Sequence, residues 1–183
     1  KVEAKKLKAF GRDFGYFAHD HQRPPRLANS GADWTTWLIL GGRGAGKTRA
    51  GAQWVRDIAL ADNKARIALV GETEHEVRAV MVEGVSGLLA VHCDDERPQW
   101  TPTTKRLAWS NGAVAEVFSA ENHEALRGPQ FSAAWCDELA KWRPNEKVLV
   151  LKGGGAEAWL SRRHRWQGKL LEGNSILCEA DWI

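Results

Sequence analysis

Cysteine, methionine and tyrosine are scarce in this sequence, whose 183 residues include three cysteines, one methionine and one tyrosine. The cysteines, Cys93, Cys136 and Cys178, lie far apart and form no CxxC pair, which argues against a disulfide framework and a zinc site. The sequence also lacks an apolar run of the roughly 18 residues that a membrane-spanning helix needs, and no signal peptide pattern opens it. These absences predict a protein of a reducing cytoplasm that has no membrane partner.

Charge of one sign is not in large excess either. The formal net charge is +3, which permits a nucleic-acid partner without arguing for one. The length suits one domain with a proper core rather than two large domains. Tryptophan, by contrast, is frequent, with ten residues.

Short apolar segments alternate with helical patterns along the chain. A buried strand is predicted over residues 35–40, and small and apolar residues recur on one face of a helix after Thr48. A second buried strand is predicted over residues 65–71, followed by a helix over 74–89 that its later glycines weaken. This alternation predicts an α/β fold with a mostly parallel sheet and flanking helices.

A hairpin and an acidic strand follow. Asn111 and Gly112 separate two short alternating runs, which is the strongest short-range signal for a β-hairpin. The run "FSAAWCDE" over residues 131–138 predicts another buried strand, which ends in Asp137 and Glu138. We therefore expect two acidic side chains at one end of the sheet.

The stretch "LILGGRGAGKTRAG" contains Gly41, Gly46, Lys47 and Thr48 at the spacing G-x-x-x-x-G-K-[ST], between a predicted strand and a predicted helix. Glycines let backbone N–H groups turn inward around phosphates, and the helix presents its N-terminus to the anion. Lys47 is expected to reach the β- and γ-phosphates, and the Thr48 hydroxyl to bind Mg²⁺. ATP and Mg²⁺ are the predicted cofactors. The predicted nucleotide-binding loop comprises Gly41, Gly42, Arg43, Gly44, Ala45, Gly46, Lys47 and Thr48.

The acidic pair supplies the chemistry that phosphate binding alone does not. Asp137 is placed to hold Mg²⁺, and Glu138 to orient and deprotonate the attacking water. Acids at a helix N-terminus are the competing interpretation. Arg43 is either an arginine finger acting in cis or a solvent-facing loop residue. Gln22 either reads the adenine edge or is a polar loop residue. Glu138, Arg43 and Lys47 are the predicted catalytic residues.

The chain from about residue 20 to 142 resembles the large terminase subunits of tailed phages, especially those of prophages and of bacterial gene transfer agents. The matching pieces are "HQRPP", "DWTTWLILGGRGAGKTRAGAQWVR", "RIALVGET", "NGAVAEVFSAENHEALRG" and "AAWCDELAKW". The resemblance implies a P-loop NTPase domain that uses ATP to move double-stranded DNA into a capsid. It also implies a homo-oligomeric ring, a portal protein and a small terminase subunit as partners, and the cytoplasm of a bacterial host.

The resemblance carries over to individual positions. Gln22 matches the adenine-contacting glutamine of the family, and Arg43, Lys47 and Thr48 match its P-loop positions. Asp137 matches the acid that binds Mg²⁺, and Glu138 matches the catalytic base.

Residues 143–183 depart from the family. Terminases continue after the acidic strand into a helix and then a strand that ends in a Thr-rich coupling motif, whereas this tail contains no threonine. We interpret residues 1–142 as the N-terminal part of the ATPase domain and 143–183 as an atypical tail, either frameshifted or divergent. The sheet is expected to be truncated after the acidic (Walker B-like) strand, which would leave an unpaired edge there. The C-terminal nuclease domain of the family is expected to be absent.

Two other functions stay open. The chain could be a truncated, non-functional remnant that at most binds ATP. It could also be another P-loop translocase or a helicase, although the resemblance extends beyond the two motifs that such enzymes share.

Overall fold

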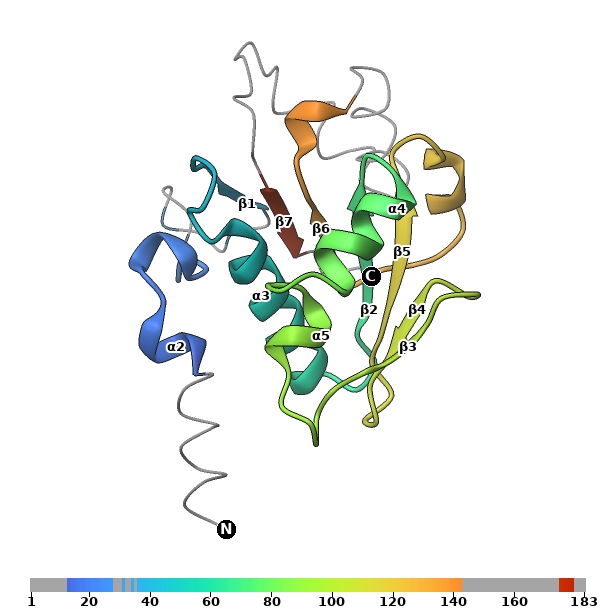
Figure 1. Cartoon of the computed structure of the whole chain (residues 1–183), viewed down its shortest axis with the longest axis horizontal. Coiled ribbons are helices and arrows are strands. Elements are labelled where there is room, and N and C mark those ends of the chain that lie inside the picture. Colours follow the sequence, from blue (N-terminus) through green and yellow to red (C-terminus); the bar gives the residue numbers. More distant parts are fainter. Residues whose placement is uncertain (1–12, 28–30, 32–33, 35, 143–174, 180–183) are drawn as a thin grey trace.

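The computed structural model describes residues 13–27, 31, 34, 36–142 and 175–179, and most of the predicted tail therefore lies outside the described residues. One sheet organises the described chain, with strand order β1-β7-β6-β2-β5-β4-β3 (Figure 1). The strands are β1 Thr36–Ile39, β2 Arg66–Gly71, β3 Gln99–Thr101, β4 Arg106–Ala108, β5 Val114–Ser119, β6 Ala133–Cys136 and β7 Ser175–Glu179.

The sheet is mixed. Strand β2 pairs in parallel with β5 on one side and with β6 on the other. Antiparallel pairs flank this parallel part, with β4 on β5 and β3 on β4 at one side and β7 on β6 at the other. The predicted α/β class is confirmed, while the parallel pairing is limited to β6, β2 and β5.

The prediction that the sheet ends at the acidic strand, β6, is wrong. Strand β7 pairs with β6 through Ala134 and Cys178, and with β1 through Leu38 and Ile176. The strand β6 therefore has a hydrogen-bonded neighbour on each side. The segment that forms β7 lies in the atypical tail, for which the sequence predicts no strand.

The longer helices pack on one face of the sheet, and among the described residues only short 3-10 helices contribute to the apolar cluster on the other face. The longest described helix, α3 (Lys47–Ala61), follows β1 and confirms the helix predicted after Thr48. It lies over the near face in Figure 1, together with α5. The other described helices are α2 Phe14–Phe17, η1 Asp20–Gln22, α4 Glu74–Glu76, η2 Val77–Val82, α5 Leu88–Val91, η3 His123–Leu126 and η4 Leu139–Lys141. None of these helices is long and apolar enough to cross a membrane.

The single helix predicted over residues 74–89 is broken into three pieces. After α4 the chain forms a π-helix, η2, in which the Glu83 N–H donates to the Arg78 carbonyl (2.9 Å). A Cβ on Gly87 would lie 2.8 Å from the carbonyl oxygen of Met81, and a Cβ on Gly84 would lie closer still to the carbonyl oxygen of Val80. The glycines therefore end this helix rather than weaken it, because the chain folds back against its last carbonyls.

Two apolar clusters lie on opposite faces of the sheet. Along β2, Ile67 and Leu69 face the cluster under α3, whereas Ala68 and Val70 face the other cluster. Successive side chains of a strand point to opposite faces, so a strand covered on both faces is apolar throughout. This is why "RIALVG" is a continuous apolar run after Arg66.

The predicted hairpin is confirmed, with one more strand than expected. Gly112 has φ +109°, and its N–H donates to the Trp109 carbonyl (3.1 Å). The Asn111 side chain accepts from the Ala113 N–H (3.1 Å) and donates to the Ala59 carbonyl (2.7 Å). The hairpin turn is thus attached to the end of α3, and β3 adds to its outer edge.

Candidate functional site

The glycine-rich loop, residues 41–48, connects β1 to α3. Gly44 and Gly46 have φ +82° and +78°, in the left-handed region that glycine adopts without a steric cost. Gly46 is also the N-cap of α3, and its carbonyl accepts from the Ala50 N–H (2.9 Å). The two glycines therefore set the turn that carries the chain from the strand into the helix.

Lys47 directs its ammonium group back over this loop. Its Nζ donates hydrogen bonds to the carbonyl oxygens of Gly41 (2.8 Å) and Gly42 (2.9 Å). Thr48 is half-buried in the first turn of α3, and Arg43 is exposed at the turn of the loop. The first N–H groups of a helix lack intrahelical acceptors and attract anions. A cation and these N–H groups fit a phosphate chain.

Gln22, in η1, contacts the glycine-rich loop across 23 residues of sequence. Its Nε2 donates to the Ala45 carbonyl (3.0 Å), and its Oε1 accepts from the His19 N–H (3.0 Å). A side chain on Gly46 would collide with the Gln22 amide. The structure thus brings Gln22 to the loop, while its contact with adenine stays a prediction.

Asp137 and Glu138 follow β6 at the sheet edge where β1 ends. The register places Ile39 opposite Ser175, and Cys136 opposite the next residue, Ile176. Since β7 lies between β1 and β6, the glycine-rich loop and the acidic pair leave the sheet at the same edge (Figure 1). Asp137 is buried, and its N–H donates to the Val70 carbonyl (2.9 Å).

Glu138 combines an exposed side chain with an unusual backbone. Its φ and ψ are 49° and 41°, which is the left-handed region. For a residue with a Cβ this conformation costs about 1–2 kcal/mol, and such residues cluster at functional sites. The side chain is 52% exposed, so its carboxylate is accessible to water.

Sequence reasoning missed the groups around Glu138. The Lys141 Nζ lies 2.6 Å from Glu76 Oε1, 3.4 Å from Glu72 Oε2 and 3.7 Å from Glu138 Oε2. The hydrogen bond to Glu76 is the main reason that the pKa of Lys141 is raised above its ordinary value. The available signal was a lysine three residues after the acidic pair. Glu76 and Glu72 come from a segment about 65 residues earlier, and no local sequence pattern links that segment to Lys141.

Thr48 and Asp137 are the candidate metal ligands. In the described part of the chain, no group of three or more His, Cys, Asp and Glu side chains is arranged to hold a metal ion. This arrangement is compatible with Mg²⁺, which binds proteins through one or two side chains and takes its other ligands from water and phosphate. The donor set, a hydroxyl and a carboxylate, has the oxygen chemistry that this ion requires.

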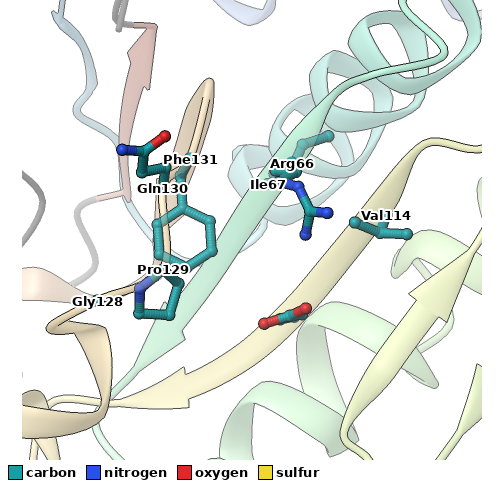
Figure 2. Close-up of a pocket in the computed structure, with 8 residues that line it drawn as sticks. Arg66, Ile67, Val114, Gly128, Pro129, Gln130 and Phe131 are labelled. Carbon is teal, nitrogen blue, oxygen red and sulfur yellow. The ribbon is translucent and has the colours of Figure 1, made fainter.

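A separate pocket of about 480 Å³ lies at the opposite edge of the sheet. Figure 2 shows Arg66, Ile67 and Val114 on one side of it and residues 128–131, which lead into β6, on the other. Arg66 and Ile67 begin β2, whereas the glycine-rich loop lies beyond the end of β1. None of the predicted site residues lines this pocket, so it is not part of the candidate nucleotide site.

A comparison with known families connects these residues to one protein class. The family described as terminase large subunit, T4likevirus-type, N-terminal matches residues 38–164, a range that includes the glycine-rich loop and the acidic pair. No curated protein and no solved structure matches the chain. Because the matched range covers more than half of the sequence, the chain belongs to the family of terminase large subunits, proteins that take part in packaging phage DNA.

Proposed function

We propose that the chain is the ATPase motor part of a terminase large subunit, with a P-loop NTPase fold that powers the packaging of double-stranded DNA into a capsid. The observation that carries this proposal is the geometry of Lys47. Its ammonium group lies over a loop whose two left-handed glycines lead directly into α3. That combination suits the β- and γ-phosphates of ATP.

Each predicted residue has a role in this proposal. Lys47 and the N–H groups of residues 41–48 bind the phosphates, and Arg43 stabilises the negative charge that develops during transfer. Thr48 and Asp137 hold Mg²⁺, which neutralises phosphate charge when bound. Glu138 accepts the proton of the attacking water. Gln22 recognises adenine.

The proposal also includes partners and location. We propose double-stranded DNA, a portal protein and a small terminase subunit as partners, a homo-oligomeric ring as the working assembly, and the cytoplasm of a bacterial host as the place. The likeness to prophage and gene transfer agent terminases rests on the sequence resemblance and stays a prediction, as do the domain boundary at residue 142 and the frameshift.

The test is the replacement Glu138→Gln. The amide keeps the shape of the side chain but cannot act as a base, and loss of a general base typically lowers a rate about 10²–10⁴-fold. We expect steady-state ATP hydrolysis to fall by this order while calorimetric binding of Mg-ATP stays close to that of the parent.

Glu124→Gln is the matched control, because the side chain of Glu124 is similarly exposed (58%) but lies in η3 and pairs with Arg127. This variant should hydrolyse ATP at the parent rate. Parent-like hydrolysis by Glu138→Gln would show that the base lies elsewhere. A parent chain that binds Mg-ATP without hydrolysing it would favour the remnant interpretation.

A further inference from the structure

The Glu138 carboxylate is drawn to one side of its strand. In the sheet order β1-β7-β6-β2, the glycine-rich loop follows β1, whereas Glu72 directly follows β2 and Glu76 lies in α4. Strand β6, which leads into Glu138, lies between these two sides (Figure 1). The ammonium group of Lys141 contacts Glu76 and Glu72, so it attracts Glu138 toward β2 and away from the loop that is proposed to bind phosphate.

Lys141, Glu76, Glu72 and Glu138 form an ion-pair group. Within this group, Lys141 is held more firmly than Glu138. Lys141 ends the short helix η4, whose first residue, Leu139, and following residue, Trp142, are buried at 3% and 2% exposure. The Lys141 N–H donates to the Glu138 carbonyl (2.8 Å), which fixes the backbone between them. The contact with Glu76 is much shorter than the one with Glu138 (2.6 Å against 3.7 Å). Glu138 is therefore the partner that can leave at the lowest cost.

We propose that Lys141, held by Glu76 and Glu72, is a positioning residue that keeps the Glu138 carboxylate in a resting position on the β2 side of β6. Hydrolysis then requires Glu138 to leave Lys141 and turn toward the nucleotide. This inference rests on the proposed function, because it concerns the residue that is proposed to act as the base. It gives Glu76 of α4, and Glu72 just before this helix, control over basal ATP turnover.

Replacing Lys141 and replacing Glu76 should change kcat in opposite directions. Lys141→Met removes the charge that holds Glu138, and an exposed ion pair changes an equilibrium by up to about fivefold. We expect kcat to rise by about two- to fivefold with an unchanged KM for ATP. Glu76→Gln removes the closest competitor for the ammonium group, so kcat should fall. The double variant should behave like Lys141→Met.

Lys105→Met is the matched control. Lys105 is as exposed as Lys141 (49% and 48%) and pairs with Glu74 of the same helix, α4, but neither residue is paired with Glu138. Its removal should leave kcat at the parent value. Lys141→Arg, which keeps the charge, should stay closer to the parent than Lys141→Met. A purely structural role of Lys141 would instead lower kcat in both Lys141→Met and Glu76→Gln.

A second measurement does not depend on turnover. A crystal structure of the full chain with Mg²⁺ and a non-hydrolysable ATP analogue should show Glu138 separated from Lys141, with the Lys141–Glu76 pair intact. A Glu138–Lys141 pair that persists in this complex overturns the inference, as does an unchanged or lower kcat of Lys141→Met in a chain whose Glu138→Gln variant is inactive. Absence of Mg-ATP binding by the parent overturns the proposed function itself, and the inference with it.

Discussion

Gly51 is the residue through which helix α3 contacts strand β6. A Cβ at this position would lie 2.6 Å from Cζ2 and 2.7 Å from Nε1 of Trp135, which is fully buried. The Trp135 Nε1 has no hydrogen-bond partner within the described residues. Packing against the helix backbone therefore holds this ring, and the lack of a side chain at residue 51 sets the distance between helix and sheet.

Gly51→Ala should destabilise the fold. Alanine gains about 1 kcal/mol of helix propensity over glycine, but overpacking a core costs about 1–3 kcal/mol. Since the Trp135 ring is fully buried, we expect the free energy of unfolding in urea to fall by about 1–2 kcal/mol. An unchanged or higher free energy of unfolding would contradict the packing at this contact.

The same replacement should also be made in a Trp135→Phe variant, which lacks the ring atoms closest to residue 51. Residues in contact give non-additive effects, so Gly51→Ala should cost less stability in this background than in the parent. Equal costs in the two backgrounds would show that the helix does not rest on the Trp135 ring.

The location of the glycine-rich loop and of the acidic pair at strand ends was predictable from residue types and spacing, while their binding of phosphate and metal stays a prediction. The structure places the residues of both motifs at one edge of the sheet. Lys141 and its glutamates were not predictable, because an ion pair between Lys141 and Glu76 depends on how β6 and β2 are paired. The Gly51–Trp135 contact was missed because it depends on how α3 packs against the sheet.

At the scale of elements, His92 connects α5 to the segment after β4. Its Nδ1 lies 2.6 Å from the Leu88 carbonyl, and the Trp109 Nε1 donates to its Nε2 (2.9 Å). An indole N–H can only donate, so Nε2 is the acceptor and the imidazole is neutral. Burial is the main cause that lowers the pKa of His92 below its ordinary value, although the contact with Leu88 opposes this effect.

This neutral histidine should make stability depend on pH. In the unfolded chain His92 takes up a proton near pH 6.5, whereas in the folded protein it does so only at lower pH. Between these two pKa values the unfolded state binds more protons, so the free energy of unfolding should fall as pH decreases. The contribution is at most about 1.4 kcal/mol per pH unit. Urea unfolding at a series of pH values from about 7.5 to 5 measures it.

His92→Gln should reduce this dependence on pH, even if the variant is less stable at every pH. His75→Gln is the control, because His75 is exposed at the surface of α4, and it should keep the parent slope. If His92→Gln and the parent lose stability equally between pH 7 and 5.5, His92 is not the group responsible.

Elements that lie in an apolar run or present one apolar helix face were predictable, and elements without such a pattern were not. The strands β1, β2, β5 and β6 and the helix α3 follow from apolar runs and from one apolar helix face. Strand β3 has three residues, which is too few to show a period. The helix that begins at Glu74 ends early because the chain folds back at Gly84 and Gly87, and its π-helical turn η2 is not indicated by the periodicity of residues 74–82.

At the scale of the whole molecule, the sheet separates the candidate nucleotide site from the pocket beside Arg66. The edge at which β1 and β6 end carries the glycine-rich loop and the acidic pair, while the opposite edge carries the pocket beside Arg66. Apolar clusters on both faces hold the strands in register between these edges. A rigid sheet of this kind keeps Lys47 and Asp137 in fixed relation, which the proposed hydrolysis of ATP requires.

Calorimetric titration with Mg-ATP, of the parent chain and of Lys47→Ala, tests the central claim most directly. The replacement removes the cation that is proposed to face the β- and γ-phosphates, and charge-assisted contacts to phosphate are among the strongest that a side chain makes. Lys64→Ala is the control, because Lys64 is an exposed lysine of the turn after α3. The parent and Lys64→Ala should bind Mg-ATP with the same affinity, and Lys47→Ala should show no measurable binding. Equal affinity in Lys47→Ala and the parent, or no binding by the parent, would contradict the assignment of this loop as the ATP site.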